Sequence, residues 1–179
     1  RARLLNRLGQ TVDAAPRIFA LNDAPRPGGL FDILKAQAIA GVLPAPAILE
    51  ALLAGLGPIW EHRPHLDGVS LGDCWPHPQL GYTPLHKLSQ WLAYSLIEPL
   101  EAASVRVVDI DGLTGLAEYR NGGLFIDMGV LELRDPRALV YNVNDPAVVA
   151  WRSLTVALLD RIAPLVRERL GASADALPL

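Results

Sequence analysis

The sequence contains one cysteine, few aromatic residues and no excess of basic charge, and each shortage excludes a class of protein. Cys74 has no partner for a disulfide within the chain, so we expect a fold without a disulfide framework and a reducing, cytoplasmic setting. With 16 Lys and Arg against 19 Asp and Glu, the chain has no basic field that would attract a polyanion. A small molecule, not a nucleic acid, is therefore the expected partner.

Long hydrophobic runs are missing as well. The longest, residues 38–49, contains two prolines and is much shorter than the roughly 20 residues that cross a bilayer, so no membrane-spanning helix is expected. The chain has no initiator methionine and no charged and then apolar leader, so we expect either a processed product or a part of a longer protein. Nothing in the residues indicates a cofactor, and they leave the oligomeric state open.

What is present favours one compact helical domain over residues 1–179. Of these residues 51% are hydrophobic, and a chain of this length buries roughly 70% of its unfolded surface. Only residues 105–110, which are rich in valine, have the composition of a strand, so we expect a mainly α fold with at most one short strand or hairpin. Apolar spacing and helix punctuation predict helices over residues 1–14, 30–41, 46–56, 84–102, 124–133 and 146–170.

Residues 57–84 read as a long irregular connection with five prolines and three of the four histidines. Long loops in compact domains are more often functional than idle. The spacing of His62 and His65 does not match a compact zinc pattern, so we predict no metal site. His77, close to Trp75, is instead predicted to line a pocket.

The densest group of charged and flexible residues is 118–121, which glycines flank. Glu118 followed closely by Arg120 supplies a carboxylate and an anion-binding cation, on backbone that can fold around a ligand. The alternative is a surface turn with a structural ion pair, since charged glycine-rich turns are common.

Two predicted helices add polar residues to this group. His86 and Gln90 lie four residues apart on one polar stripe, with Lys87 beside it. Arg152 lies within an apolar helix face, where its charge needs a buried partner such as Glu118 or Asp127. The alternative for Arg152 is a packed stem whose guanidinium reaches water.

Residues 107–115 are similar to the diphosphoribose-binding loop of phosphoribosyltransferases, in which acidic residues follow a strand and a Thr-Gly turn holds phosphate. That fold needs several parallel strands joined by crossover helices, whereas this sequence predicts one strand. A phosphoribosyltransferase is therefore the second reading.

Three blocks, residues 66–78, 86–92 and 111–124, resemble the fourth protein of the uracil-catabolism (URC) pathway of fungi and bacteria. The resemblance runs through nearly all of the chain. Members of that family are about twice as long, and this sequence is similar to their C-terminal half. The resemblance implies a role in uracil degradation.

A more distant resemblance links the chain to the queuosine-salvage nucleosidases, helical proteins whose fold is related to DNA glycosylases. Lys87 and Gln90 match their Lys-x-x-Gln helix, and residues 113–120 match a second block, with Glu118 in place of an aspartate. Arg152 matches an arginine in their last helix. Arg120 ends the second block, and the residues that follow it, Asn121-Gly122, differ from those of the nucleosidases. The difference implies that the base is recognised in another way.

Together the two resemblances imply hydrolysis of an N-glycosidic bond that releases urea from a ribosylurea phosphate. A carboxylate stabilises the cationic sugar of such a reaction and positions water. Alternatives are a phosphoribosyltransferase-type uracil enzyme and a noncatalytic pathway scaffold. The residues expected at the site are Glu118 as the catalytic carboxylate, Asp111 or Asp127 as a second acid, and Trp75, His77, His86, Lys87, Gln90, Tyr119, Arg120, Asn121 and Arg152 for substrate binding.

Overall fold

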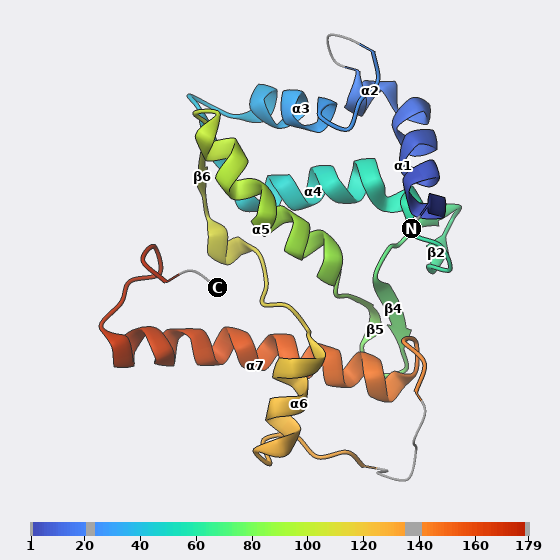
Figure 1. Cartoon of the computed structure of the whole chain (residues 1–179). Coiled ribbons are helices and arrows are strands. Elements are labelled where there is room, and N and C mark those ends of the chain that lie inside the picture. Colours follow the sequence, from blue (N-terminus) through green and yellow to red (C-terminus); the bar gives the residue numbers. More distant parts are fainter. Residues whose placement is uncertain (1, 21–23, 135–140, 178–179) are drawn as a thin grey trace. The chain divides into compact units, whose positions relative to one another are not determined.

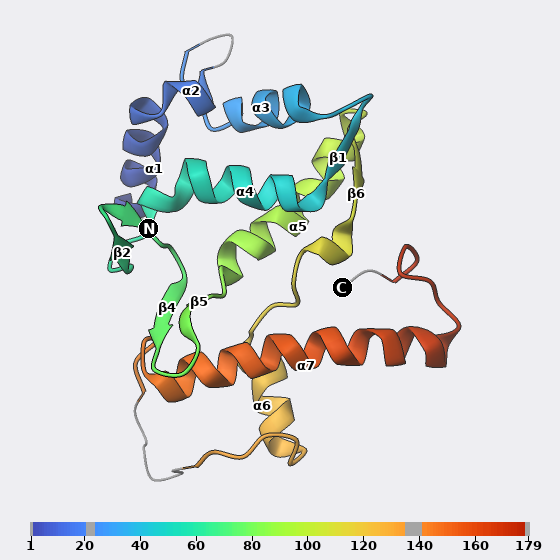
Figure 2. The same cartoon turned by 180° about the vertical axis from the view of Figure 1, so that it is seen from behind.

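The chain is mainly helical and forms two compact units (Figures 1 and 2). The computed structural model describes residues 2–20, 24–134 and 141–177. The first unit runs to Gly72 and adds Leu88–Leu113, and the second consists of Asp73–Lys87 and the chain from Thr114 onward. The single domain predicted from the sequence stays a prediction, and each unit is described by itself below.

Helices make up most of the first unit. The three predicted over its N-terminal part are confirmed with small shifts of their ends, although Arg1 lies outside the described residues. Pro16 begins a short additional helix, because a proline lacks only an N–H that the first turn leaves unused. The helices and the 3₁₀ turn of this part are α1 (Ala2–Ala14), α2 (Pro16–Phe19), α3 (Gly29–Gln37), α4 (Ala45–Leu56) and η1 (Gly57–Ile59).

The core of the first unit lies around α4 and a pair of parallel strands. Strand β1 (Val42–Pro44) pairs with β6 (Arg106–Val108), so the strand predicted from the valine-rich segment is confirmed. Apolar residues of α3, α4 and these strands are fully buried, and they hold the helices together by the burial of apolar surface. The largest of these core side chains are Phe19, Leu34, Leu43, Ile48 and Leu52.

The helix predicted over 84–102 begins three residues later, as α5 (Lys87–Ala102). Pro84 ends a strand instead of opening the helix. Extended backbone is the conformation that suits both a proline and the edge of a two-stranded pair, and this pairing overrides the local preference.

The prediction of at most one strand or hairpin is wrong, because the segment read as irregular contains two hairpins. One has an Asp67-Gly68 turn, in which both residues have positive φ, as a tight hairpin turn requires. Its strands are β2 (His65–Leu66) and β3 (Val69–Ser70). The other hairpin belongs to the second unit and pairs β4 (Cys74–His77) with β5 (Gly81–Pro84).

Two helices and the second hairpin make the second unit. The helix predicted over 124–133 is α6 (Tyr119–Asp127), which begins five residues earlier and ends six residues earlier than predicted and contains Gly122 and Gly123 within its turns. The long helix α7 (Pro146–Leu170) has the predicted ends, and Gly171 follows it in the left-handed conformation. The helix continues through Pro164, which has no N–H to donate to the backbone of the preceding turn.

The segment similar to phosphoribosyltransferase loops lies after β6, where residues 110–112 form the 3₁₀ turn η2 (Ile110–Gly112). Among the described residues, β6 pairs with β1 and with no further strand. The several parallel strands of that enzyme fold are therefore not found in the part of the chain that the structure describes.

Within the same described ranges, no helix combines the length and the apolar character that crossing a membrane requires.

Candidate functional site

Glu118 lies immediately before the first residue of α6, with extended backbone at the helix N-cap. The side chain of Asn121 fixes this turn: its oxygen accepts the Glu118 N–H at 2.9 Å, and its amide donates to the Leu116 carbonyl at 2.7 Å. The predicted substrate-binding residue Asn121 thus holds the backbone of Glu118 in place.

The carboxylate of Glu118 forms an ion pair with Lys87. The distance between Lys87 Nζ and Glu118 Oε1 is 2.6 Å, and the two side chains are 27% and 35% exposed, respectively. Both groups are therefore partly shielded from water while a ligand can still reach them. The structure brings together here two residues that the sequence had assigned to the same site.

Asp73 connects Lys87 to Arg152. Its carboxylate accepts two hydrogen bonds from the guanidinium of Arg152, at 2.9 and 2.6 Å, and another from the backbone N–H of Lys87 at 3.1 Å. A fourth comes from Trp75 Nε1 at 2.6 Å. Because Asp73 fixes the backbone at Lys87, it also sets the point from which the lysine side chain reaches Glu118.

The environment of Asp73 keeps its carboxylate ionised. Burial alone would raise its pKa, but the hydrogen bonds and charge of Arg152, together with the N–H groups of Trp75 and Lys87, lower the pKa from 3.8 to about 2. Asp73 therefore carries no proton at neutral pH, and it acts as a fixed negative charge that orients its donors.

A small apolar cluster supports this network. The Trp75 ring is buried with Leu85 and Val149, which joins the β4 and β5 hairpin to α7. Gly122 of α6 lies so close to α7 that an added Cβ would be 2.9 Å from Thr155 Oγ1 and 3.0 Å from Trp151 Nε1. These contacts bring Glu118 on one helix and Arg152 on the other into the same unit.

His86 is the residue between the hairpin and α5, and its backbone has a positive φ of 45°. Its Nδ1 is buried and has no hydrogen-bond partner among the described residues. Burial lowers the pKa of the imidazole, although the charge of Asp73 acts in the opposite direction. The ring is thus biased toward its neutral form.

The chain matches the family described as "Protein of unknown function (DUF1688)" over residues 1–179. The chain belongs to this family. It is 40% identical over 180 residues to Protein urg3 of Schizosaccharomyces pombe, covering 95% of this chain and 41% of that protein. It is 35% identical over 205 residues to Uracil catabolism protein 4 of Lachancea kluyveri, covering 95% of this chain and 46% of that protein.

These matches confirm the resemblance to the fourth-protein family of uracil catabolism. The chain spans about half the length of the curated relatives it matches. No solved structure matches it.

Several predicted site residues of this DUF1688 chain lie on the surface of the second unit. Tyr119 is 69% exposed, and its hydroxyl accepts a hydrogen bond from Arg120 Nε at 3.1 Å. Asp127 ends α6, and the helical rise of 1.5 Å per residue puts it roughly 13 Å along the axis from Glu118. His77 ends β4 and accepts the backbone N–H groups of Gln79 and Leu80.

Two others belong to the first unit. Asp111 is exposed in η2, and Gln90 is buried in α5. The structure therefore groups Trp75, His86, Lys87, Asn121 and Arg152 with Glu118 in one unit, and it does not join Asp111 or Asp127 to that group.

The expected partner of Arg152 was wrong. Sequence reasoning named Glu118 or Asp127, whereas the structure pairs Arg152 with Asp73. The two residues are 79 positions apart, so no local spacing links them. A usable signal was the position of Asp73 directly before a buried Cys-Trp pair, where a carboxylate needs a cationic partner.

The described residues hold no group of three or more His, Cys, Asp and Glu side chains arranged to bind a metal ion.

Proposed function

We propose that the protein acts in uracil catabolism and that Glu118 is the catalytic carboxylate of an N-glycosidic bond hydrolysis, releasing urea from a ribosylurea phosphate-like compound. The observation that carries the proposal is the ion pair of Glu118 with Lys87, next to the network centred on Asp73. The name of the Lachancea kluyveri relative, Uracil catabolism protein 4, supports the pathway.

In the proposed reaction the bond between C1′ of the sugar and the urea nitrogen breaks, and the oxygen of water bonds to C1′. The leaving nitrogen gains one proton, which the water supplies overall. Positive charge develops on the sugar as the bond breaks, and an ionised carboxylate beside it lowers the barrier. Glu118 supplies that charge, and it also accepts a hydrogen bond from the attacking water.

The basic residues divide between two roles. Both NH₂ groups of Arg152 donate to the carboxylate of Asp73. In this proposal Arg152 therefore positions the site and does not contact the substrate. Among the described residues, Lys87 Nζ pairs with Glu118 Oε1, and in the proposed complex its remaining N–H groups bind a ligand phosphate. Arg120, exposed at the start of α6, is the second phosphate-binding residue.

Asp73 does not serve as the general acid. A carboxyl with a pKa of about 2 has no proton to donate at neutral pH. The proposal therefore needs one carboxylate of this chain, not two. It includes a likeness in fold to the helical nucleosidases related to DNA glycosylases, whose similar sequence block contains an aspartate at the position of Glu118.

The decisive experiment replaces Glu118 by glutamine, which keeps the size and an acceptor oxygen at the N-cap but removes the charge. We expect urea release from ribosylurea phosphate to fall by a factor of about 10³ or more, since lost transition-state stabilisation of 4 kcal/mol has that effect. Glu132→Gln, at an exposed position outside α6, is the matched control. Unchanged turnover in Glu118→Gln, with an unchanged circular dichroism spectrum, would reject the assignment.

A thermal-shift series separates this function from its alternatives. A glycosidase is stabilised by a sugar phosphate or a urea analogue, because a ligand that binds the folded state raises Tm. A phosphoribosyltransferase responds to diphosphoribose with magnesium. A scaffold responds to neither and copurifies with another enzyme of the pathway.

A further inference from the structure

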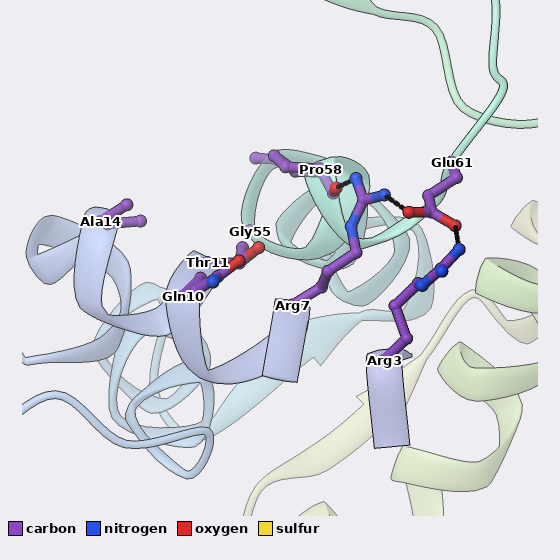
Figure 3. A pocket seen from close by; sticks show the side chains of 10 residues that line it. Arg3, Arg7, Gln10, Thr11, Ala14, Gly55, Pro58 and Glu61 are labelled. Atoms are coloured by element: carbon purple, nitrogen blue, oxygen red, sulfur yellow. Dashed lines mark hydrogen bonds and ion pairs between the residues drawn. The ribbon is translucent and has the colours of Figure 1, made fainter. Parts of the chain in front are cut away.

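The first unit carries a second group of charges that the proposed reaction does not use. It lines a hollow of about 670 Å³ between α1 and the end of α4 with η1 (Figure 3). Arg3 and Arg7 come from successive turns of α1, and Glu61 follows η1. The hollow is large enough for a small metabolite, since ligand pockets measure about 300–1,000 Å³.

Arg7 is held in a fixed position at the edge of this hollow. Its Nη2 donates to the Pro58 carbonyl at 2.6 Å, and its Nη1 lies 2.7 Å from Glu61 Oε1. The Arg7 side chain is 29% exposed. A guanidinium that is already oriented loses little conformational freedom when it binds an anion.

Arg3 is held much less tightly. Its Nη1 is 3.8 Å from Glu61 Oε2, which exceeds hydrogen-bond distance, and its side chain is 81% exposed. Figure 3 shows the carboxylate of Glu61 between the two guanidinium groups, with one oxygen toward each. Glu61 thus occupies the place that the oxyanion of a bound ligand would take.

A second hollow of about 520 Å³ shares Arg7, Pro58 and Glu61 with the first. Its remaining lining includes Trp60 and His62. An aromatic ring beside an arginine suits a ligand that has a planar body as well as a negative charge. The two hollows together can hold both the planar body and the negatively charged group of such a molecule.

We infer that this groove is a binding site for a small planar molecule that carries an oxyanion, either a phosphate or a carboxylate. The ligand displaces Glu61 from Arg3 and Arg7, and its ring contacts Trp60. An exposed ion pair contributes at most about 1 kcal/mol, so Glu61 is an internal competitor that a more highly charged ligand replaces. The inference requires no glycosidic chemistry and stands apart from the proposed function.

The test is a nuclear magnetic resonance titration that follows the indole N–H signal of Trp60, which reports on this groove alone. Uridine 5′-monophosphate supplies ring and phosphate, orotate supplies ring and carboxylate, and uridine supplies the ring without the anion. We expect the phosphate or the carboxylate ligand to shift the signal saturably, and uridine to bind at least tenfold more weakly. Comparing the first two ligands identifies the oxyanion.

Substitutions give the inference a signature that a structural ion pair would not produce. Glu61→Gln removes the competitor and is expected to tighten binding by about threefold to tenfold. Arg3→Ala is expected to weaken it by a similar factor, whereas the matched control Arg106→Ala, at an exposed arginine of β6, leaves it unchanged. Glu118→Gln also leaves the Trp60 titration unchanged, so failure here and failure of the proposed function are distinguishable.

Three results would overturn the inference. They are the absence of any saturable Trp60 shift in both the wild type and Glu61→Gln, weaker binding in Glu61→Gln, and binding that Arg3→Ala does not alter. Ligand-induced shifts confined to the signals of Trp75 and Trp151 would place the binding elsewhere and would equally reject it.

Discussion

The two units use the same chemical groups, arginine and carboxylate, in opposite ways. In the second unit Arg152 and Asp73 are 14% and 15% exposed, and the carboxylate accepts four hydrogen bonds in all. In the first unit the side chain of Glu61 is 38% exposed and is shared between two arginines, one of them loosely.

The two groups differ in how well water can solvate their charges once the charges separate. When two largely buried charges separate, each is left without a partner and with little water to solvate it, so the pair in the second unit stays closed and fixes its surroundings. Exposed charges are solvated again when they part, so the carboxylate in the first unit is replaceable by a ligand. We therefore interpret the Arg152–Asp73 pair of the second unit as a scaffold for Lys87 and Glu118. We interpret the exposed charges of the first unit as a binding surface.

The largest expected effect comes from breaking the buried pair. Arg152→Met leaves Asp73 ionised without its bidentate partner, and we expect the free energy of unfolding to fall by about 3–5 kcal/mol. Urea denaturation measures this directly. Adding Asp73→Asn to Arg152→Met should restore a large part of the loss, because the orphaned charge is then gone. A single variant as stable as the wild type would show that the pair is not the scaffold described here.

The steric fit between α6 and α7 should give the next effect. Gly122→Ala places a Cβ within 3.0 Å of Trp151 Nε1, whose ring is held by its hydrogen bond to the Gly122 carbonyl at 3.0 Å. Overpacking of this kind costs about 1–3 kcal/mol. Gly123 has nothing within 4 Å of the corresponding position, so Gly123→Ala should stabilise the helix by up to about 1 kcal/mol. Melting temperatures that change in the same direction for both variants would contradict this reading.

Features of the fold that are determined by residues close in the sequence could be predicted, whereas features that depend on contacts between distant residues could not. The ends of α7 were predicted correctly because Pro146 and Gly171 act through their own backbone dihedrals. Asp145 lies at the N-cap position of this helix but does not cap it through its side chain, since its carboxylate accepts the Asn142 N–H at 2.7 Å.

The hairpins show a local signal that was overlooked. Asp67-Gly68 is a strong hairpin turn, but strands of two residues are too short to show an alternating pattern. The start of α6 was predicted wrongly for a different reason. Glycines at 122 and 123 favour a loop when they are read locally, whereas the contact of Gly122 with Trp151 and Thr155 makes a small residue necessary within the helix.

Three residues of the candidate site were named from the sequence, but the contacts that connect them were not. Lys87, Glu118 and Arg152 were all named, yet Asp73, which binds both Arg152 and the backbone of Lys87, was not among the predicted site residues. Its role arises from Trp75, Lys87 and Arg152 together, and that convergence exists only after the hairpin has packed on α7. Tertiary contacts of this kind leave no periodic trace in a sequence.

Acid should remove about 2 kcal/mol of stabilisation from the charge group of the second unit. The pKa of Asp73 is about 2 in the folded protein against an ordinary value of 3.8, so the ionised carboxylate stabilises the folded state above pH 3.8. This contribution is lost as the pH falls through 3.8 toward about 2. In urea titrations between pH 6 and 2.5, the wild type should lose most of its advantage over Asp73→Asn as the pH falls below 3.8. A difference between the two proteins that is constant across the range would refute the linkage.

The smallest expected effect belongs to the exposed pair of the first unit, and it sharpens the comparison most. Glu61→Gln should change the free energy of unfolding by less than about 1 kcal/mol, because both partners remain accessible to water. Salt should reduce even this difference, since the Debye length falls from about 10 Å at 0.1 M to about 3 Å at 1 M. The corresponding loss in Arg152→Met should respond much less to salt, as buried charges are poorly screened. If Glu61→Gln instead destabilised the protein as strongly as Arg152→Met, with no salt dependence, the carboxylate would be a structural member of its unit and no ligand would displace it.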